Sequence, residues 1–484
     1  MSKKILVIGL IASCFFQVKG QNVFSIEEII SRAKDQSIFS KQAETQKETS
    51  YWQYRSFRTN YNPQLRLNGN LPTYTNYVTP VIQPDGSKLY LPVNQINPNL
   101  NFGLQQPIGS TGGTISANTS YNFFNDISAN ENQWSGTVFN VRLDQPVFAY
   151  NPWKWDKRIK PVVYEESKRI YVERQEEISA QAVSIFFDVL RQQVNEQIAR
   201  FNLANNDTIY KIEQGRYNIG TTSQDKLLQV ELQLLRSRQD VAQAQLELEN
   251  ARLQLRFYIG LRDGDDFELI LPDKIPAFDV QIEEALSYAR LNRADYIGFE
   301  RRKLEAQSEV ARAKGQRYQT TISASYGLNN VGPSVSDLYI DPSKQQIANI
   351  SFNVPLVDWG RNKAMMQTAL ANKRLRDYEI EQSKVIFEQE IITKVRQFEM
   401  MRLQIEITKK SDEIAQERYN VAQNRYLIGK IDITNLNIAL TEKDNAKRSY
   451  LDALKSFWTA YYDLRRLTLY DFANKQLLYT PEAN

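Results

Sequence analysis

The 484-residue chain contains no histidine, and its only cysteine is Cys14. Residues 1–20 carry Lys3 and Lys4, then an apolar core and a small-residue end, so we expect a secretory signal cleaved before Gln21. The mature chain then has neither thiol nor imidazole, which excludes disulfides, thiol chemistry and imidazole metal sites. In a second interpretation Cys14 is a lipidated first residue. We favour simple cleavage, because the apolar core before Cys14 is short.

An excess of charge and long apolar runs are also missing. Removing Lys3, Lys4 and Lys19 with the signal lowers the formal charge from +4 to +1, and nothing in the composition predicts a nucleic-acid partner. After the signal, no apolar run approaches the roughly twenty residues that a membrane helix requires. No acid pair, activated nucleophile or phosphate loop stands out, so we expect no enzyme, cofactor or metal site. A membrane span would have to consist of strands.

What the chain does contain is a duplication. Downstream landmark residues recur at a constant offset of 209, whereas residues 26–28 upstream recur as 282–284 at an offset of 256. The two offsets differ by 47 residues. The first copy therefore holds 47 extra residues, and the pair predicts one pseudo-symmetric domain of two similar halves. The landmarks at the constant offset of 209 are Pro146 and Pro355, Arg216 and Arg425, Tyr217 and Tyr426, Ile219 and Ile428, and Gly220 and Gly429.

The periodicity of each segment predicts its structure. Leu227, Leu234 and Val241 begin a series at intervals of seven, which indicates a coiled-coil seam in a helix that returns along a preceding long one. The predicted parts are a signal over 1–20, a first repeat over 21–260, a linker over 261–280, a second repeat over 281–469 and a periplasmic tail over 470–484. The first repeat comprises a helix over 25–61, strands and extracellular loops over 64–145, and long helices over 155–217 and 222–260. The second comprises a helix over 281–318, strands over 320–354, and long helices over 361–426 and 431–468.

The expected strands alternate with period two. Ile322, Ala324 and Tyr326 are separated by polar residues, and the segments of the first copy follow the same pattern. One apolar and one polar face fit an outer-membrane barrel, whereas a soluble sheet with one solvated face is the other interpretation. We favour the barrel because of the export signal and the aromatic strand ends. Membrane-interface aromatics are expected at Tyr150, Trp153, Trp155 and Trp359, although a buried aromatic corner gives a similar pattern.

The repeated Arg-Tyr-x-Ile-Gly pattern at 216–220 and 425–429, and the stretch Pro-Leu-Val-Asp-Trp-Gly-Arg-Asn at 355–362, resemble the TolC family of outer-membrane efflux proteins. The resemblance implies a mainly α fold with a membrane β-barrel part. Duplicated long antiparallel coiled-coil helices form a trimeric α-barrel tunnel, and each protomer adds four strands to a shared twelve-stranded β-barrel.

The same resemblance implies a function and partners. The protein is expected as a homotrimer in the outer membrane of a Gram-negative-type bacterium, extending into the periplasm. A periplasmic adaptor (membrane fusion) protein and an inner-membrane transporter are the implied partners, besides outer-membrane lipid. The expected function is a passive export channel without catalysis. A coiled-coil structural or adhesive cell-surface protein is the alternative.

The two helix-to-helix turns are the expected periplasmic tips. Gly220 and Gly429 stand where a helix ends and the chain reverses. Thr222 and Asp225 have the spacing of a capping box, and Asp432 is a candidate N-cap. Pore-facing acids are the alternative for Asp225 and Asp432, and we favour capping. Adaptor contact or bracing near the closed end is expected for Arg216, Tyr217, Arg425 and Tyr426, with ordinary solvated residues as an equal alternative. In the family, acids often close the second tip, but the aligned positions here are Asn435 and Ile438, which puts a carboxylate ring in doubt.

The extra sequence of the first copy includes a segment around 99–124. Two alternating runs joined by a turn-rich segment at 107–113 predict a hairpin. This hairpin either lies outside the barrel wall near the surface or gives six strands per protomer in a wider barrel. We favour the first arrangement, because it keeps the family's strand count.

Overall fold

The structure is a computed structural model that describes residues 22–261, 267–272 and 275–480. The expected signal, with Cys14, lies outside the described residues. The described chain forms two compact units. The helical unit comprises the residues up to Ala43, Glu173–Ala285 and the residues from Ile392, and the sheet unit comprises Glu44–Val172 and Leu286–Ile391. None of the described helices combines the length and apolarity needed to cross a membrane.

The first helical segment of each repeat consists of two helices, not one. The segment expected over 25–61 forms α1 (Ile26–Gln36) and α2 (Ile38–Thr59), and the one expected over 281–318 forms α5 (Ile282–Asn292) and α6 (Ala294–Gly315). The expectation of single helices is therefore wrong. The breaks fall at Ser37 and Arg293, which are equivalent residues and both have extended backbone. At Ser37 the side chain accepts a hydrogen bond from the Ser40 amide, which starts the next helix.

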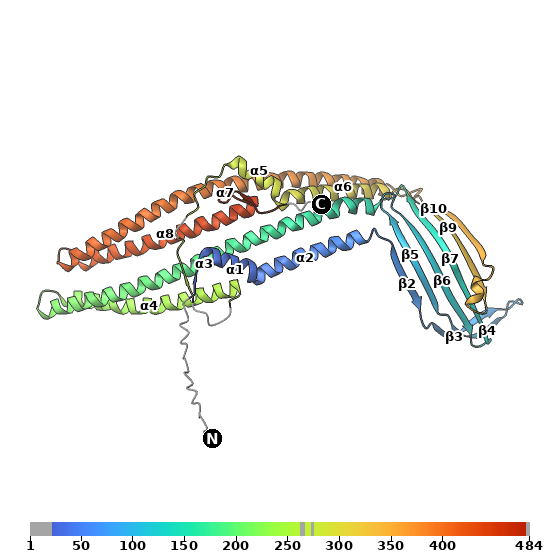
Figure 1. Ribbon diagram of the computed structural model, residues 1–484, viewed down its shortest axis with the longest axis horizontal. Coiled ribbons are helices and arrows are strands. Elements are labelled where there is room, and N and C mark those ends of the chain that lie inside the picture. The colour runs from blue at the N-terminus through green and yellow to red at the C-terminus, as the bar shows by residue number, and fades with distance from the viewer. Residues whose placement is uncertain (1–21, 262–266, 273–274, 481–484) are drawn as a thin grey trace, which may run out of the picture. The chain divides into compact units, whose positions relative to one another are not determined.

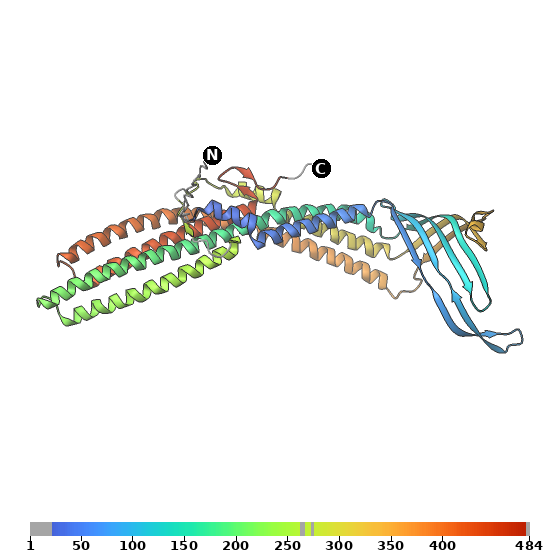
Figure 2. The same cartoon turned by 60° about the horizontal axis from the view of Figure 1, so that its bottom comes forward.

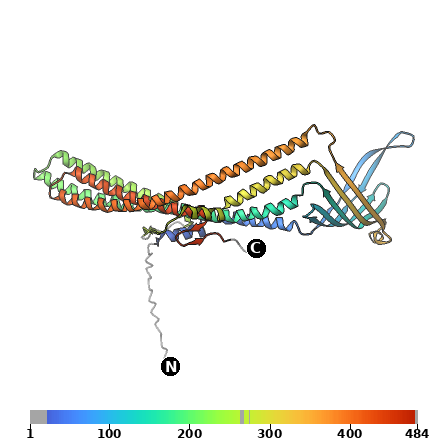
Figure 3. The ribbon, with the colours of Figure 1, turned by 90° about the horizontal axis from the view of Figure 1, so that it is seen from above.

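Two long helices and two return helices follow the strands. They are α3 (Pro152–Asn218), α4 (Gln224–Ile259), α7 (Arg361–Leu427) and α8 (Ile433–Thr468). With 67 residues each, α3 and α7 are about 100 Å long. Proline is tolerated at the first helical position, so α3 starts at Pro152, before the expected residue 155, and it also contains Pro161. In the helical unit, α4 runs back along α3 and α8 runs back along α7 (Figure 3).

The seven-residue seam of α4 is confirmed. Buried seam residues of this helix recur at intervals of three, four or seven positions, at Val230, Leu234, Ser237, Ala244, Leu248, Leu255 and Tyr258. The small residues in the series let the paired helices approach closely. The helical unit also contains two short sheets. In one, β1 (Asn22–Phe24) pairs in parallel with β8 (Phe267–Leu269), and in the other, β11 (Tyr470–Asp471) pairs antiparallel with β12 (Gln476–Leu477).

The sheet unit contains one antiparallel sheet. Its strands are β2 (Gln64–Asn70), β3 (Tyr74–Ile82), β4 (Lys88–Ile96), β5 (Asn99–Ile108), β6 (Gly113–Asp126), β7 (Glu131–Val147), β9 (Gln319–Gly332) and β10 (Ser343–Asn353). A 3₁₀ turn, η1 (Ser336–Tyr339), lies between β9 and β10. The long strands lie side by side in the order β10, β9, β7, β6, β5 and β2 (Figure 1).

The first hairpin of the sheet extends beyond the other strands. β3 and β4 pair with each other along their whole length, but β4 meets β6 only at Gln95 and Ile96. Because β2 leads into β3 and β4 leads into β5, the four segments form one long interrupted hairpin. Its far part, formed by β3 and β4, projects from the sheet (Figure 2).

The hairpin expected around 99–124 lies inside the sheet, so our preference for a position outside the wall is wrong. β5 pairs with β2 on one side and with β6 on the other, and β6 pairs in turn with β7. The backbone hydrogen bonds of β5 and β6 are therefore satisfied in the same way as those of β9, which has β7 and β10 as neighbours.

Candidate functional site

The two tips of the helical unit have the same backbone geometry. Gly220 has φ of +74° and Gly429 has φ of +71°, the left-handed conformation in which side chains are strained. The next residue returns a hydrogen bond to the helix, because the Thr221 amide donates to the Arg216 carbonyl and the Lys430 amide donates to the Arg425 carbonyl, each over 2.9 Å. Both turns therefore end their helices with the Schellman-type pattern expected of glycine.

The return helices begin at different kinds of cap. Asp432 caps α8, as expected, and accepts a hydrogen bond of 2.9 Å from the Asn435 amide. The cap of α4 is Ser223, whose side chain accepts from the Lys226 amide. The predicted Thr222–Asp225 capping box is therefore wrong, because the helix begins one residue later and places Asp225 inside its first turn.

These caps carry a prediction. Asp432→Ala and Ser223→Ala are each expected to lower the free energy of unfolding by about 1 kcal/mol, since each leaves a helix amide without its acceptor. Asp225→Ala is the matched control and is expected to cost less than about 0.5 kcal/mol, because only the helix dipole favours its charge. Urea unfolding of the purified protein measures the three changes, and an Asp225 effect as large as that of Ser223 would refute the assignment.

Glu213, on the last turns of α3, is the centre of a polar cluster that connects the two tips. The Tyr426 hydroxyl, at the end of α7, donates a 2.7 Å hydrogen bond to Glu213 Oε1. Arg216 Nη1 lies 2.6 Å from the same oxygen, and its guanidinium lies 5.5 Å from the centre of the Tyr426 ring. Arg216 also donates a long hydrogen bond of 3.5 Å to the Leu427 carbonyl. We call Glu213, Arg216 and Tyr426 the tip clamp.

Burial and hydrogen bonding set the charges of the tip clamp. Only 5% of Glu213 and 3% of Tyr426 is exposed. Desolvation alone would raise the pKa of Glu213, but hydrogen bonds from Tyr426, Arg216 and Thr222 outweigh it and lower that pKa below 4.5. Desolvation and the neighbouring carboxylate raise the pKa of Tyr426 above its usual 10. At neutral pH the clamp therefore holds a carboxylate, a guanidinium and a neutral phenol.

The duplication is broken at this place. The position equivalent to Glu213 is Ala422, so the second repeat has no acid at this position. Tyr426 of the second repeat instead donates its hydrogen bond to Glu213 of the first. Of the four residues expected to brace helices or contact a partner, the structure brings Arg216 and Tyr426 together, whereas Tyr217 and Arg425 are exposed. Our sequence reasoning missed Glu213, although an acid in one repeat against alanine in the other was a visible signal.

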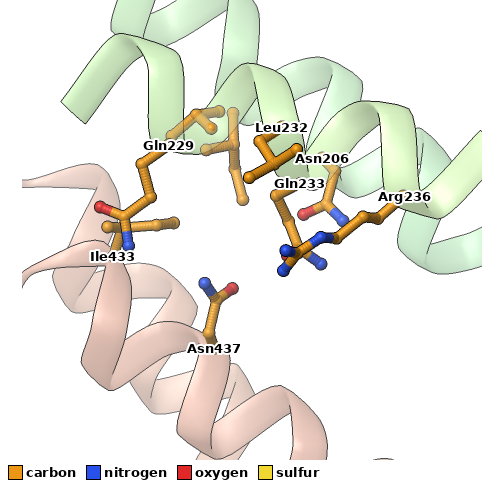
Figure 4. A pocket seen from close by; sticks show the side chains of 9 residues that line it. Asn206, Gln229, Leu232, Gln233, Arg236, Ile433 and Asn437 are labelled. Carbon is orange, nitrogen blue, oxygen red and sulfur yellow. The ribbon is translucent and has the colours of Figure 1, made fainter. Parts of the chain in front are cut away.

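The clamp lies on an apolar cluster shared by the two helical pairs. Buried in it are Ile209, Val230, Tyr419, Tyr426, Ile433, Leu436 and Leu440. Next to this cluster α4 and α8 are separated by a small cavity of about 100 Å³. Its lining is mixed, and Figure 4 shows Asn437 of α8 facing Gln233 and Arg236 of α4. The two pairs are therefore in close apolar contact on one side and separated by polar side chains on the other.

The outermost tip residues are apolar and exposed. Ile219 is 75% exposed and Ile428 is 65% exposed, at equivalent positions beside the two glycines. Asn435 is exposed and donates from its side chain to Asp432, so this position carries an amide and no carboxylate. Among the described residues, no group of three or more acidic, cysteine or histidine side chains is arranged to hold a metal ion.

The expected interface aromatics have mixed environments in the sheet unit. The Tyr150 hydroxyl lies 2.7 Å from Ser308 Oγ of α6, and the ring of Trp153 packs edge-on against Tyr61. Trp155 is half-buried below Arg158. Trp359, which is equivalent to Tyr150, is 96% exposed. The aromatic residues at the strand-to-helix corner of the first repeat are thus partly buried, as in the alternative interpretation. At the corner of the second repeat, Trp359 is exposed.

Comparisons with known proteins agree with this fold. A sequence model of the family described as outer membrane efflux protein matches residues 30–261 and 281–468. A crystal structure of CusC, whose title concerns transmembrane channel formation, has a TM-score of 0.64 at 15% identity and covers 92% of this chain and 91% of its own. The Campylobacter jejuni CmeC outer membrane channel scores 0.65 at 15% identity, with coverages of 92% and 85%. The Vibrio cholerae outer membrane protein VceC scores 0.59 at 13% identity, with coverages of 92% and 95%. No curated protein sequence matched the chain.

Proposed function

The chain belongs to the outer membrane efflux protein family, and on this premise we propose that it is the outer-membrane channel of a tripartite export system. Three copies form a passive conduit that receives substrate from an inner-membrane transporter through a periplasmic adaptor. The observation that carries the proposal is the two-faced sheet. Its strands alternate apolar and polar residues, whereas the described helices lack an apolar span. A lipid-facing wall around a polar lumen accounts for both features.

The tip clamp supports a closed resting state at the periplasmic end. Tyr426 of α7 donates a hydrogen bond to Glu213 of α3. Arg216, also on α3, contacts the Tyr426 ring and the Leu427 carbonyl of α7, so these contacts tie the two helical pairs together. The adjacent cavity leaves part of the contact between the pairs without close packing. Opening therefore requires mainly that the clamp and the small apolar cluster separate. In this proposal Arg216 and Tyr426 brace the closed end.

The exposed tip residues support a contact with the adaptor. Ile219 and Ile428 stand out at the two turns, next to the exposed side chains of Tyr217 and Arg425. An apolar centre with polar surroundings is typical of a protein interface. At the strand-to-helix corner of the second repeat, the exposure of Trp359 and Leu356 supports a contact with lipid at the membrane boundary.

The test is to crosslink intact cells, recover the protein through a C-terminal tag and identify its partners by mass spectrometry. We expect a trimer together with an adaptor and an inner-membrane transporter. A proton-driven pump would indicate small-molecule efflux, and an ATP-driven transporter would indicate secretion of polypeptides or large molecules. Recovery of surface proteins alone, or a monomer in mild detergent, would refute the proposal in favour of a structural or adhesive role.

A further inference from the structure

The strands of the sheet unit share one continuous apolar face that includes the extra hairpin. From the pairing register, Leu65 of β2 lies beside Leu104 of β5, which lies beside Ala117 of β6. The same row continues through Val141 of β7 to Tyr326 of β9. A neighbouring row joins Ile115, Leu143, Ala324 and Ala348, which brings in β10. Side chains on these rows point to the same side of the sheet.

The opposite face is polar over the same strands. One row joins Asn68, Asn101 and Ser120 across β2, β5 and β6, and another joins Ser116, Arg142 and Ser325 across β6, β7 and β9. Arg142 and Asp144 form an ion pair of 2.8 Å on this face, and Ser323 donates to Asp144 over 2.7 Å. The extra hairpin therefore has the same two faces as the strands that the two repeats share.

The extra strands also reach the end of the sheet where the helices attach. The turn between β5 and β6 lies at the start of α3, because Asn151 Nδ2 donates to the Gly109 and Ser110 carbonyls over 3.1 and 3.2 Å. Gln106 Nε2 donates to the Tyr61 carbonyl, just after α2, over 2.7 Å. With 10 and 14 residues, β5 and β6 are long enough for the nine to eleven residues that a tilted transmembrane strand needs.

The two edges of the sheet are complementary in direction. In the described sheet, β2 pairs only with β5, and β10 pairs only with β9. The chain runs away from α2 in β2 and toward α7 in β10, so the β10 edge of one copy and the β2 edge of the next pair antiparallel. Closure between copies removes both unpaired edges, which an isolated protomer would leave open.

We infer that each protomer contributes six strands, β2, β5, β6, β7, β9 and β10, to the membrane wall, with second copies of this chain as the partners at both edges. This inference rests on the proposed function, which supplies the trimer and the membrane. Three copies then form eighteen strands. Because barrel diameter grows roughly linearly with strand number, the lumen is about one and a half times as wide as that of twelve strands. The wall therefore suits bulkier cargo than a four-strand protomer would.

Cysteine labelling tests the inference, and the mature chain offers no background thiol if the signal is removed as expected. On β5, Asn101→Cys probes the polar face and Phe102→Cys the apolar face. The matched pair on β9 is Ser325→Cys and Tyr326→Cys. Trimers in phosphatidylcholine vesicles are treated with a charged, water-soluble maleimide, and bimane-labelled samples are measured in brominated phosphatidylcholine. Size-exclusion chromatography confirms that each variant remains a trimer.

We expect the two pairs to behave alike. Asn101→Cys should react with the charged maleimide within about threefold of the Ser325→Cys rate, and Phe102→Cys should react at least tenfold more slowly, with bimane quenched by brominated lipid as at Tyr326→Cys. If β9 shows this alternation but both β5 positions react rapidly and escape quenching, six strands per protomer is wrong while the channel stands. If β9 itself shows no alternation, the proposed membrane wall is wrong and the inference is overturned with it.

Discussion

Replacing Glu213 by alanine is expected to open the periplasmic end of the channel at neutral pH. The change removes the acceptor of the Tyr426 hydroxyl and of Arg216 Nη1, which leaves Arg216 with its long hydrogen bond to the Leu427 carbonyl. A hydrogen bond to a charged group contributes about 1.5–3 kcal/mol, and about 1.4 kcal/mol corresponds to a factor of ten. The open fraction in single-channel recordings should therefore rise at least about tenfold.

Two further variants make this result specific. Tyr426→Phe should give a smaller increase, because Glu213 keeps Arg216 as its ion-pair partner within α3 at 2.6 Å and Arg216 keeps its hydrogen bond to the Leu427 carbonyl of α7. Glu417→Ala removes an exposed acid from α7 and serves as the control, with recordings like those of the unmodified protein. Unchanged conductance in a Glu213→Ala trimer would show that the clamp does not hold the end closed.

The same clamp predicts a pH dependence. Since the folded pKa of Glu213 is lowered, its stabilisation is fully present above 4.5 and is lost as the pH falls through the lowered folded value. The raised pKa of Tyr426 acts at alkaline pH. The folded protein favours the neutral phenol, so this contribution to stability is lost as the pH rises above 10. Recordings from pH 3 to pH 8 should show opening only at the acidic end, and Glu213→Gln should remove most of that dependence.

The largest loss of stability is expected for Arg465→Met in the helical unit. Arg465 Nε lies 2.8 Å from Glu176 and its Nη1 lies 2.9 Å from Asp471, and the two carboxylates are only 3% and 5% exposed. The change leaves Glu176 with Lys34 as its remaining ion pair and Asp471 with neutral donors such as Tyr461. Removing one partner of a buried ion pair costs about 3–5 kcal/mol, because the other charge stays buried.

The neighbouring arginine provides the control. Arg466 pairs at 3.7 Å with Asp463 of the same helix, in a partly exposed position, so Arg466→Met should cost less than about 1 kcal/mol. Both are measured by urea unfolding followed by tryptophan fluorescence at one protein concentration, since a trimer's stability depends on concentration. Equal losses for the two variants would mean that the Arg465 network does not stabilise the unit.

Several features could be predicted from the sequence because they depend on neighbouring residues. The alternation from Ile322 to Tyr326 places side chains on opposite faces of any strand, and the seven-residue spacing from Leu227 places them on one face of any helix. Gly220 and Gly429 permit the left-handed conformation irrespective of what surrounds them. Asp432 as a cap needs only the first turn that follows it.

Other features were wrong in the prediction or absent from it because small local differences decide them. Thr222 and Ser223 are both good N-cap residues, and the structure uses Ser223, leaving Thr222 to bond with Glu213. The breaks at Ser37 and Arg293 are single extended residues within strongly helical segments, and arginine is not a capping residue, so no local signal marked the second break.

The sequence by itself determined the duplicated order of helices and strands, the two faces of each strand and the glycine turns, because these follow from periodicity and backbone freedom within a few residues. Only the tertiary structure decided that β5 and β6 lie between β2 and β7, and that Tyr426 meets Glu213 across 213 positions of chain. Strand order and long-range hydrogen bonds depend on which segments meet. The alternating pattern of a strand is the same beside any partner, so it cannot specify its neighbour.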